Sequence, residues 1–264
     1  MFFMKKREEI ASLTANYHTH TWRCKHAKGT EREYVETAIE AGMKVLGFSD
    51  HTPYPFPGGY CSSFRMEVDK LEGYVTVVND LRREYARDIE IHLGLEAEYY
   101  PAYFEDLLRL IEPYGVEYML LGQHFIRNEL GGSYNGVPSS SVEDLRQYAS
   151  ELCEAMKTGR FLYLAHPDLF HFTGPRAAYE EEMRPVIETA NSLNIPLEIN
   201  LLGLGTGRHY PNEAFWKLAG KLGATAILGC DAHSPEGLNN PAVLAAGRKL
   251  AEASGLRLID KVEI

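Results

Sequence analysis

The sequence lacks the features that would place a protein in or beyond a membrane. No run of 18 or more apolar residues occurs, so no membrane span is expected. The N-terminal stretch MFFMKKREEI has four apolar residues followed by a charged run, the reverse of a secretory signal. Only four cysteines are present, none in a C-x-x-C pair, which disfavours a zinc ribbon or a redox motif and suits a reducing compartment. A cytoplasmic protein is therefore expected.

The sequence also carries an excess of negative charge and lacks several common catalytic motifs. The net charge is −10, which argues against a nucleic-acid backbone or an anionic membrane as partner. A small anionic substrate remains compatible, because bound metal ions can reverse the local field. No Walker loop is found, which disfavours nucleoside triphosphate chemistry, and no G-x-S-x-G elbow supplies a serine nucleophile.

Short apolar runs alternate with longer helical patterns along the whole chain. A length of 264 residues, with 45% apolar and 24% charged residues, suits a single α/β domain spanning residues 1–264. The runs have the length and apolar character of buried parallel strands. Seven are found: TANYHTH, KVLGFSDH, IEIHLGLEAEY, YMLLGQHF, FLYLAHPD, PLEINLLG and TAILGCDAH.

Helical periodicity fills the segments between these runs. Thr30 begins a capping box with Glu33, and the predicted helix ends at Gly42. Seven β-then-α units predict a parallel sheet with helices outside, and right-handed crossovers can close such a series into a barrel. An open doubly wound sheet is the alternative. The other helices are expected over 71–85, 101–111, 141–159, 177–194, 212–223 and 241–254, with Pro185 as a possible kink.

Potential metal ligands stand where the predicted strands end, and this favours the barrel. In a barrel all carboxyl ends of the strands meet at one face, where active sites are built. The H-x-H and D-x-H pairs are also informative, because positions i and i+2 of a strand point to the same side. His26 follows the first strand and can fold back onto the same cluster. The candidate ligands are His18, His20, His26, His51, Glu96, His124, His166, Asp231 and His233.

Nine candidates are too many for one ion. Zinc or iron takes four to six ligands, so the set suits two or three ions that share a bridging carboxylate. Mixed imidazole and carboxylate ligands suit zinc, iron(II) or manganese. Clustered divalent ions lower the pKa of a bound water toward ~7 and hold the oxygens of a transferring phosphoryl group, which indicates hydrolysis of a phosphate ester. Asp50 is expected to orient His51.

Arginines near the expected mouth of the barrel are candidates for binding phosphate in a forked geometry. Arg65 and Arg208 are favoured because both lie in loops that follow strands. Arg127, just after His124, is a further candidate, and Arg176 is a weaker one.

The strings HTH, SDH, GLE, GQH, AHPD and DAH, in this order from His18 to Pro235, resemble the polymerase and histidinol phosphatase (PHP) family. The strings EYVETAIEAG, GFSDHTP, FRM, GLEAEYYP and LEIN are similar to its monofunctional histidinol-phosphatases. The resemblance implies a distorted seven-stranded (β/α) barrel, a trinuclear metal centre and hydrolysis of L-histidinol phosphate to L-histidinol and phosphate. All nine candidates match the family's ligands, with Glu96 as the bridging carboxylate.

The remaining roles are hypotheses. Asp231 and His233 are candidates for the acid that protonates the leaving alkoxide. Glu98 lies near the ligands or meets the cationic amine of the substrate, for which Asp168 is a second candidate.

Three rival functions remain open. A PHP-type phosphoesterase acting on nucleotides would carry the same ligands, but oligonucleotide binding should add basic residues interleaved with aromatics. An amidohydrolase would need a bridging carboxylated lysine, and no predicted strand ends in lysine. The third is a non-catalytic metal-binding regulatory module, which metal-dependent turnover of any phosphate ester would exclude.

Overall fold

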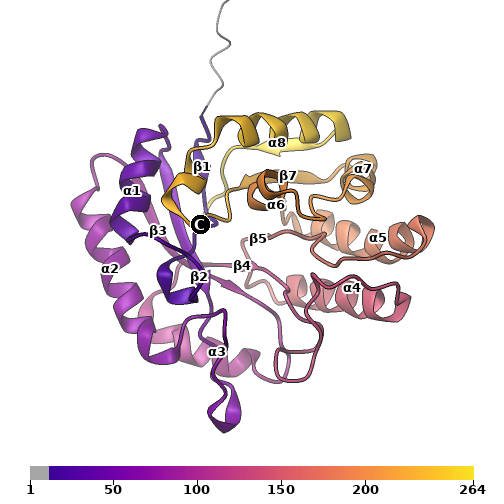
Figure 1. Ribbon diagram of the computed structural model, residues 1–264, viewed down its shortest axis with the longest axis horizontal. Helices are drawn as coiled ribbons and strands as arrows, with labels where there is room; N and C mark the ends of the chain where they lie inside the picture. Colours follow the sequence, from indigo (N-terminus) through magenta and orange to yellow (C-terminus); the bar gives the residue numbers. More distant parts are fainter. Residues whose placement is uncertain (1–11) are drawn as a thin grey trace, which may run out of the picture.

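A parallel β-sheet surrounded by helices forms the framework (Figure 1), and the computed structural model describes residues 12–264. The strands follow one another in sequence order from β1 to β8, and every pairing is parallel. The sequence argument about a secretory signal concerns residues 1–10, which lie outside the described part. The strands are β1 Ala15–Asn16, β2 Val45–His51, β3 Glu90–Ala97, β4 Tyr118–Leu121, β5 Tyr163–Leu164, β6 Leu197–Asn200, β7 Thr225–Gly229 and β8 Arg257–Ile259.

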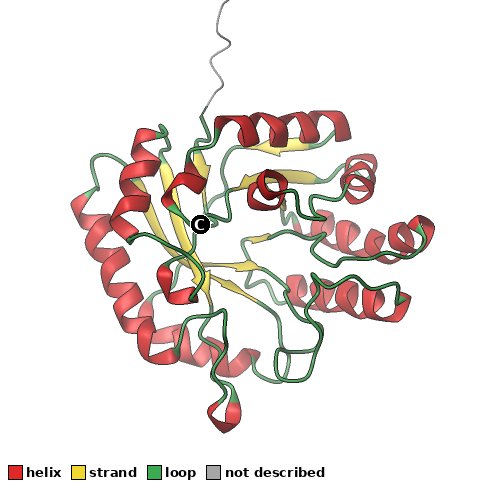
Figure 2. Cartoon of the chain, viewed as in Figure 1, coloured by secondary structure: helices red, strands yellow, loops and turns green. Residues whose placement is uncertain are grey.

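The helices lie around the perimeter of the sheet (Figure 2). Seven of the eight α-helices in the described part of the chain were predicted, and the capping box of Thr30 with Glu33 is confirmed. The predicted helix from Pro101 begins three residues later, at Phe104, after a turn. No helix in residues 12–264 is long and apolar enough to cross a membrane. The helices are α1 Glu31–Glu40, α2 Leu71–Glu84, α3 Phe104–Ile111, α4 Val142–Lys157, α5 Arg176–Leu193, α6 Leu201–Thr206, α7 Glu213–Lys221 and α8 Pro241–Ser254.

The expected seven-stranded closed barrel is corrected to an open, curled half-barrel of eight strands. After α8 the chain returns as β8 and pairs with the start of β7, from Thr225 to Ile227. This added strand occupies the edge that β1 would need for closure. β1 and β7 approach each other only at their carboxyl ends, through an isolated bridge between Thr19 and Ala232. The run PLEINLLG also divides, since its last three residues begin the short helix α6.

Strand alternation decides which side chains face the concave side. Gly47 and His51 share one face of β2, while Gly94 and Glu96 share one face of β3. The buried cluster on this side is built from strands and the residues that follow them, without any helix: Ala15, Tyr17, Val45, Tyr118, Leu120, Tyr163, Ala165 and Ile227. The larger apolar cluster joins the sheet to the helices.

Tyr118 fills the concave side below the strand ends that carry the candidate ligands. Its single O–H donates to the carbonyl oxygen of Tyr17 (2.7 Å), and the carbonyl oxygen of Phe48 also lies within hydrogen-bond distance (3.1 Å). The ring can occupy this place only because glycines stand opposite it. A Cβ atom on Gly94 would lie 2.3 Å from Cζ of Tyr118, and one on Gly47 would lie 2.2 Å from its hydroxyl.

Replacing Gly94 with alanine should therefore destabilise the protein. The added methyl group would displace the Tyr118 ring, so we expect the free energy of unfolding to fall by about 1–3 kcal/mol. The matched control is Gly73→Ala in α2, where a Cβ meets nothing within 4 Å. It should raise stability by up to about 1 kcal/mol. Urea unfolding of both variants measures this, and equal stabilities would contradict the packing argument.

Candidate metal centre

Glu96, at the end of β3, is the centre of a buried cluster of histidines. Its Oε2 lies 3.0 Å from Nδ1 of His51 and 3.5 Å from Nε2 of both His18 and His20. Its Oε1 lies 2.8 Å from Nε2 of His166 and 3.5 Å from Nε2 of His124. Four strand ends thus bring five histidines to one carboxylate, whose two oxygens face different histidines. This is the arrangement expected of a carboxylate that bridges two ions.

Asp231, just after β7, is the second carboxylate of the cluster. Its Oδ1 lies 3.0 Å from Nε2 of His20, 3.5 Å from Nε2 of His18 and 3.3 Å from Nδ1 of His233. Asp231 has φ +47°, and His166 has φ +28°. Non-glycine residues rarely adopt this region, and such strain is concentrated at functional sites. The backbone is therefore strained at two of the ligand positions, Asp231 and His166.

His26 reaches the cluster from the loop after β1, as the sequence analysis expected. Its Nε2 lies 2.9 Å from Nε2 of His233. Its Nδ1 donates a hydrogen bond of 2.8 Å to the carbonyl oxygen of Cys24, which leaves Nε2 unprotonated and directed at the cluster. The structure thus brings all nine predicted ligands together at the carboxyl ends of the strands.

Acidic residues hold the outer nitrogens of several ligands. Glu198 of β6 accepts from Nδ1 of His18 at 2.8 Å and from the backbone N–H of His166 at 3.0 Å. Glu98 accepts from Nδ1 of His124 at 2.9 Å. Such acceptors fix the ring orientation and keep the inner nitrogen free to bind a metal. Asp50, expected to orient His51, accepts from the backbone N–H of His51 at 2.8 Å and lies 3.5 Å from Nδ1 of His20.

The donor set fits divalent ions. Several buried nitrogen and oxygen atoms of the cluster have no hydrogen-bond partner within the described part of the protein, which is costly unless another group satisfies them: Nε2 of His18, both ring nitrogens of His20, Nδ1 of His51 and Oε2 of Glu96. The groups whose ligand atoms lie within 4.8 Å of one another include three that consist only of predicted ligands. They are His18 with His20 and Asp231, His18 with Glu96 and His166, and His20 with His51 and His233. Two to three ions of zinc, iron or manganese suit this arrangement.

Electrostatic coupling within the cluster is strong. Burial opposes a charge on Glu96, but the neighbouring histidines, above all His124 and His18, hold its pKa well below the usual range. Burial likewise opposes a charge on His18, yet the carboxylates around it raise its pKa. Burial and the charge of His20 instead lower the pKa of His51. These groups do not titrate independently, because each depends on the charge of its neighbours.

A cavity of about 380 Å³ lies directly against the cluster. Arg208, from the segment after α6, lies at its wall, and its guanidinium donates a hydrogen bond of 2.5 Å to the hydroxyl of Tyr210. Ligands of the cluster and Ser63 form the rest of the polar wall. The apolar and aromatic lining consists of Phe64, Phe125, Tyr134, Leu169 and Tyr210.

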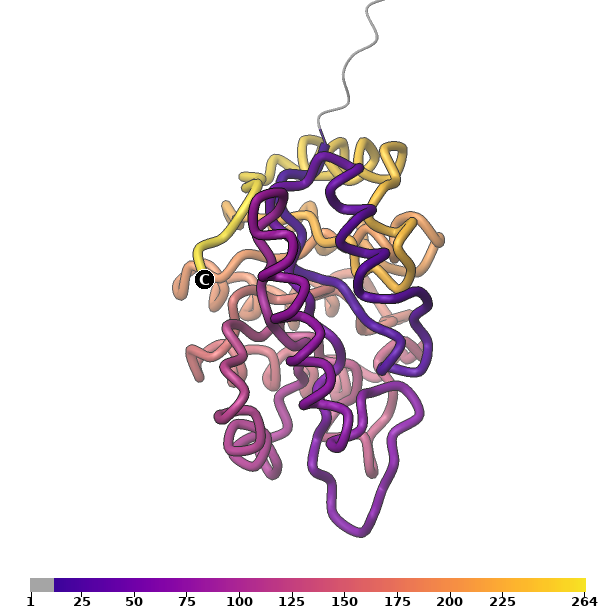
Figure 3. Tube along the Cα trace, turned by 90° about the vertical axis from the view of Figure 1, so that its left-hand side faces the viewer, coloured from indigo at the N-terminus to yellow at the C-terminus, as the bar shows by residue number. Residues whose placement is uncertain are grey.

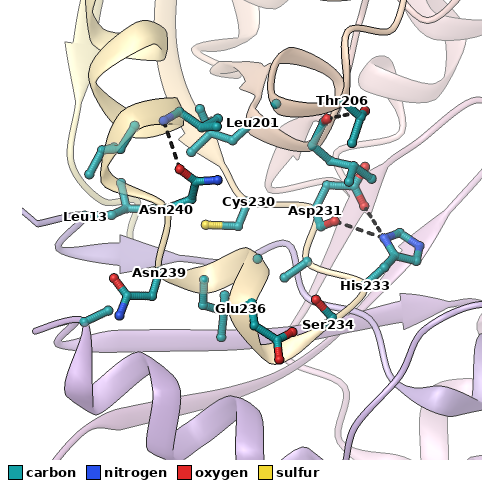
Figure 4. Close-up of a pocket in the computed structure, with 18 of the residues that line it drawn as sticks. Leu13, Leu201, Thr206, Cys230, Asp231, His233, Ser234, Glu236, Asn239 and Asn240 are labelled. Atoms are coloured by element: carbon teal, nitrogen blue, oxygen red, sulfur yellow. Dashed lines mark hydrogen bonds and ion pairs between the residues drawn. The ribbon is translucent and has the colours of Figure 1, made fainter.

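A second cavity, of about 730 Å³, adjoins the cluster on the side of α6 and α8 and shares His26, Asp231 and His233 with the first. Figure 4 shows Asp231 and His233 close together at one end of it, joined by dashed contacts. Leu201, Cys230 and Asn240 line it farther away.

Five residues that the sequence analysis offered for substrate binding do not line the smaller cavity: Arg65, Glu98, Arg127, Arg176 and Asp168. Arg65 is 2% exposed and is engaged with carboxylates. Glu98 is fully buried and bound to Arg65 and His124, so its oxygens are not directed at a substrate amine. Arg127 is exposed, and its backbone N–H donates to Glu151. Asp168 accepts from the backbone N–H of Asn212 and from the Trp216 indole, and burial raises its pKa to about 6.

Sequence reasoning missed Glu198, which holds two of the ligands. The signal was present: a charged residue inside the buried strand LEIN, two positions before Asn200. The side-chain amide of Asn200 itself donates to Oδ2 of Asp231 at 3.1 Å. Tyr134 had no signal, since the loop that brings it to the cavity shows no motif.

Fold and cluster together define a metal-binding α/β half-barrel with its site at the carboxyl ends of the strands. The model of the PHP domain matches residues 16–201, so the chain belongs to the PHP domain family. It is 27% identical over 238 residues to a Deinococcus radiodurans protein named "Probable histidinol-phosphatase", covering 83% of this chain and 85% of that one. It is 28% identical over 118 residues to a histidinol-phosphatase of Bacillus subtilis, covering 42% and 44%.

The fold is similar to a solved histidinol phosphate phosphatase of Lactococcus lactis subsp. lactis, which is complexed with zinc, L-histidinol and phosphate. The TM-score is 0.74 at 19% identity, over 96% of this chain and 99% of that one.

Neutralising Glu198 should weaken metal binding without disturbing the ligands themselves. Glutamine at this position keeps the volume but loses the negative charge that orients His18, so metal affinity should fall about 10–100-fold. Glu90→Gln, an exposed glutamate at the start of β3, is the control. Metal content and competition titration with a chromophoric chelator measure both variants. Equal affinity of Glu198→Gln and the unmodified protein would refute the role of this carboxylate.

Proposed function

We propose that this chain is a metal-dependent phosphatase that hydrolyses L-histidinol phosphate to L-histidinol and phosphate in histidine biosynthesis. Residues 1–264 would act as one catalytic domain in the cytoplasm. The observation that carries the proposal is the buried cluster of imidazoles and carboxylates beside a cavity lined by Arg208. Membership of the PHP family and the similarity to histidinol phosphatases, one of them solved with zinc, L-histidinol and phosphate, support the choice of substrate.

The chain's own groups would divide the work as follows. Divalent ions held by the cluster would supply a water of lowered pKa at neutral pH and neutralise charge on the phosphoryl oxygens. Arg208 faces the same cavity, so its remaining N–H groups can hold a phosphate oxygen in a forked geometry. The aromatic wall of Phe64, Phe125 and Tyr134 suits a flat imidazole ring. The ions would be held by His18, His20, His26, His51, Glu96, His124, His166, Asp231 and His233.

Asp231 and His233 are the proposed sources of the proton for the leaving oxygen, because both line the cavity. Metal binding competes with this role, since an atom that binds an ion carries no proton to donate. His233 is the better placed of the two. Its side chain is 19% exposed, whereas that of Asp231 is 6% exposed and faces three histidines. A proton donor must reach the leaving group within hydrogen-bond distance, and the more exposed ring meets that condition more easily.

Phosphate release from L-histidinol phosphate, beside nucleotide and sugar phosphates, tests the proposal directly. We expect a strong preference for L-histidinol phosphate, two to three metal ions per chain, loss of turnover after chelation and recovery with added zinc or manganese. Turnover that favours nucleotides would instead make the chain a nucleotide phosphoesterase. Bound metal without turnover of any ester would favour a non-catalytic metal-binding module.

Replacing Arg208 with alanine should weaken substrate binding. A hydrogen bond to a charged group contributes about 1.5–3 kcal/mol, so KM should rise about ten- to a hundredfold. Arg176→Ala in α5 is the matched control, since Arg176 is exposed and pairs with Glu180 of its own helix. Steady-state kinetics with L-histidinol phosphate compare the two. An unchanged KM in Arg208→Ala would remove this residue from phosphate binding.

A further inference from the structure

Arg65 lies between two buried carboxylates. Its Nη1 and Nη2 donate to Oε2 and Oε1 of Glu98 at 3.1 and 3.0 Å, a bidentate pair. Its Nε donates to Oε2 of Glu129 at 2.7 Å, and Nη1 also donates to the carbonyl oxygen of Thr52 at 3.1 Å. All three charged side chains are at most 3% exposed. We refer to Glu98, Arg65 and Glu129 as the Arg65 triad.

One side of the Arg65 triad leads to the metal cluster. Glu98 shares its Oε1 between Nη2 of Arg65 and Nδ1 of His124. With Nδ1 protonated and bound to Glu98, the other ring nitrogen of His124 carries a lone pair, and it faces Oε1 of Glu96 at 3.5 Å. The guanidinium of Arg65 thus holds the carboxylate of Glu98 in place, and this carboxylate in turn orients the ligand His124. Lysine cannot reproduce this, because an ammonium group lacks the planar fork.

The other side of the Arg65 triad leads to the cavity wall. Glu129 belongs to the loop after β4, and its Oε1 accepts from the hydroxyl of Tyr60 at 2.9 Å. Tyr60 belongs to the loop between β2 and α2, which projects beyond the helices (Figure 3). Glu129 therefore binds this loop at two points, Tyr60 and Arg65.

The ring of Phe64 lies under the Arg65 guanidinium, 4.5 Å from its central carbon, and stacks on Phe125 with centroids 5.6 Å apart. Both rings line the smaller cavity. The contacts of Glu129 with the loop between β2 and α2 therefore support the aromatic wall of the smaller cavity and not the metal ligands.

We propose that Arg65 is a positioning residue that sets two parts of the site at once: the His124 ligand through Glu98 and the aromatic wall through Glu129. This inference rests on the proposed function and deepens it, since it assigns the FRM arginine to the scaffold of the site rather than to phosphate. The two carboxylates have separate tasks, so their removal should have separable effects.

The test compares Glu98→Gln, Glu129→Gln and Arg65→Lys, with Arg82→Lys as control. Arg82 makes an analogous pair with Glu117 and a backbone carbonyl, at the opposite end of β3. Metal affinity is measured by competition titration, and KM and kcat with whichever phosphate ester the unmodified enzyme turns over best. Thermal unfolding of each variant establishes that it folds.

We expect Glu98→Gln to weaken the affinity for one metal ion about 10–100-fold. Glu129→Gln should leave metal affinity unchanged and raise KM about tenfold, because the aromatic wall loses an anchor while the ligands stay in place. Arg65→Lys should show both effects, and Arg82→Lys neither.

Arg65→Lys with unchanged metal affinity and KM would overturn the proposal, as would loss of metal affinity in Glu129→Gln. A rise in KM for Arg65→Lys that is specific to phosphate esters, without change in metal affinity, would return Arg65 to phosphate binding. If Arg65→Lys fails to fold, the contrast between the two glutamine variants decides the question. The metal titration needs no substrate, so it tests the triad even if L-histidinol phosphate is not turned over.

Discussion

The structure depends on the burial of one carboxylate among five imidazoles. Glu96 is 1% exposed, and each of its oxygens faces ring nitrogens from other strand ends. Neither a bare carboxylate nor an unpaired imidazole is stable in such a place, so each group depends on the others and on the ions the set is suited to hold. The carboxyl ends of the strands bring the ligands around Glu96, and the strained backbone of Asp231 and His166 helps to hold two of them there. The surrounding fold keeps strand ends from distant parts of the chain at one point.

Buried carboxylates behind the metal ligands hold those ligands in place. Glu198 lies beneath His18 and His166, and Glu98 beneath His124. Burying an ionised carboxylate costs free energy, and here the buried carboxylates orient the imidazole rings of the ligands. Arg65 extends this principle outward, since one guanidinium satisfies two of the buried acids and connects the ligands to the loops around the cavity. A residue type that suggests phosphate binding from sequence is here directed toward protein carboxylates instead.

The sequence predicts the ligands far better than the groups around them. His18, His20, Glu96 and Asp231 could be found because strand ends in parallel α/β folds converge by rule, and their residue types have few other uses in that position. Helix ends were readable where a side chain caps them, as at Thr30. That the sheet stays open could not be predicted, because the three-residue β8 carries no sequence pattern that distinguishes it from a loop. Arg65 and Arg127 were placed in the cavity by their loops alone, and the direction of a side chain in a loop depends on partners that lie far away in sequence.

The open edge of the sheet has a consequence for how the site comes into being. Groups from the first and seventh strands meet across this seam, where His26 and His233 are 207 positions apart. During synthesis the chain presents His18, His20 and His26 long before it gains the second carboxylate, Asp231. Early fragments therefore hold imidazoles without the acids that complete the binding geometry. The complete ligand set is therefore present only when the two ends of the sheet come together.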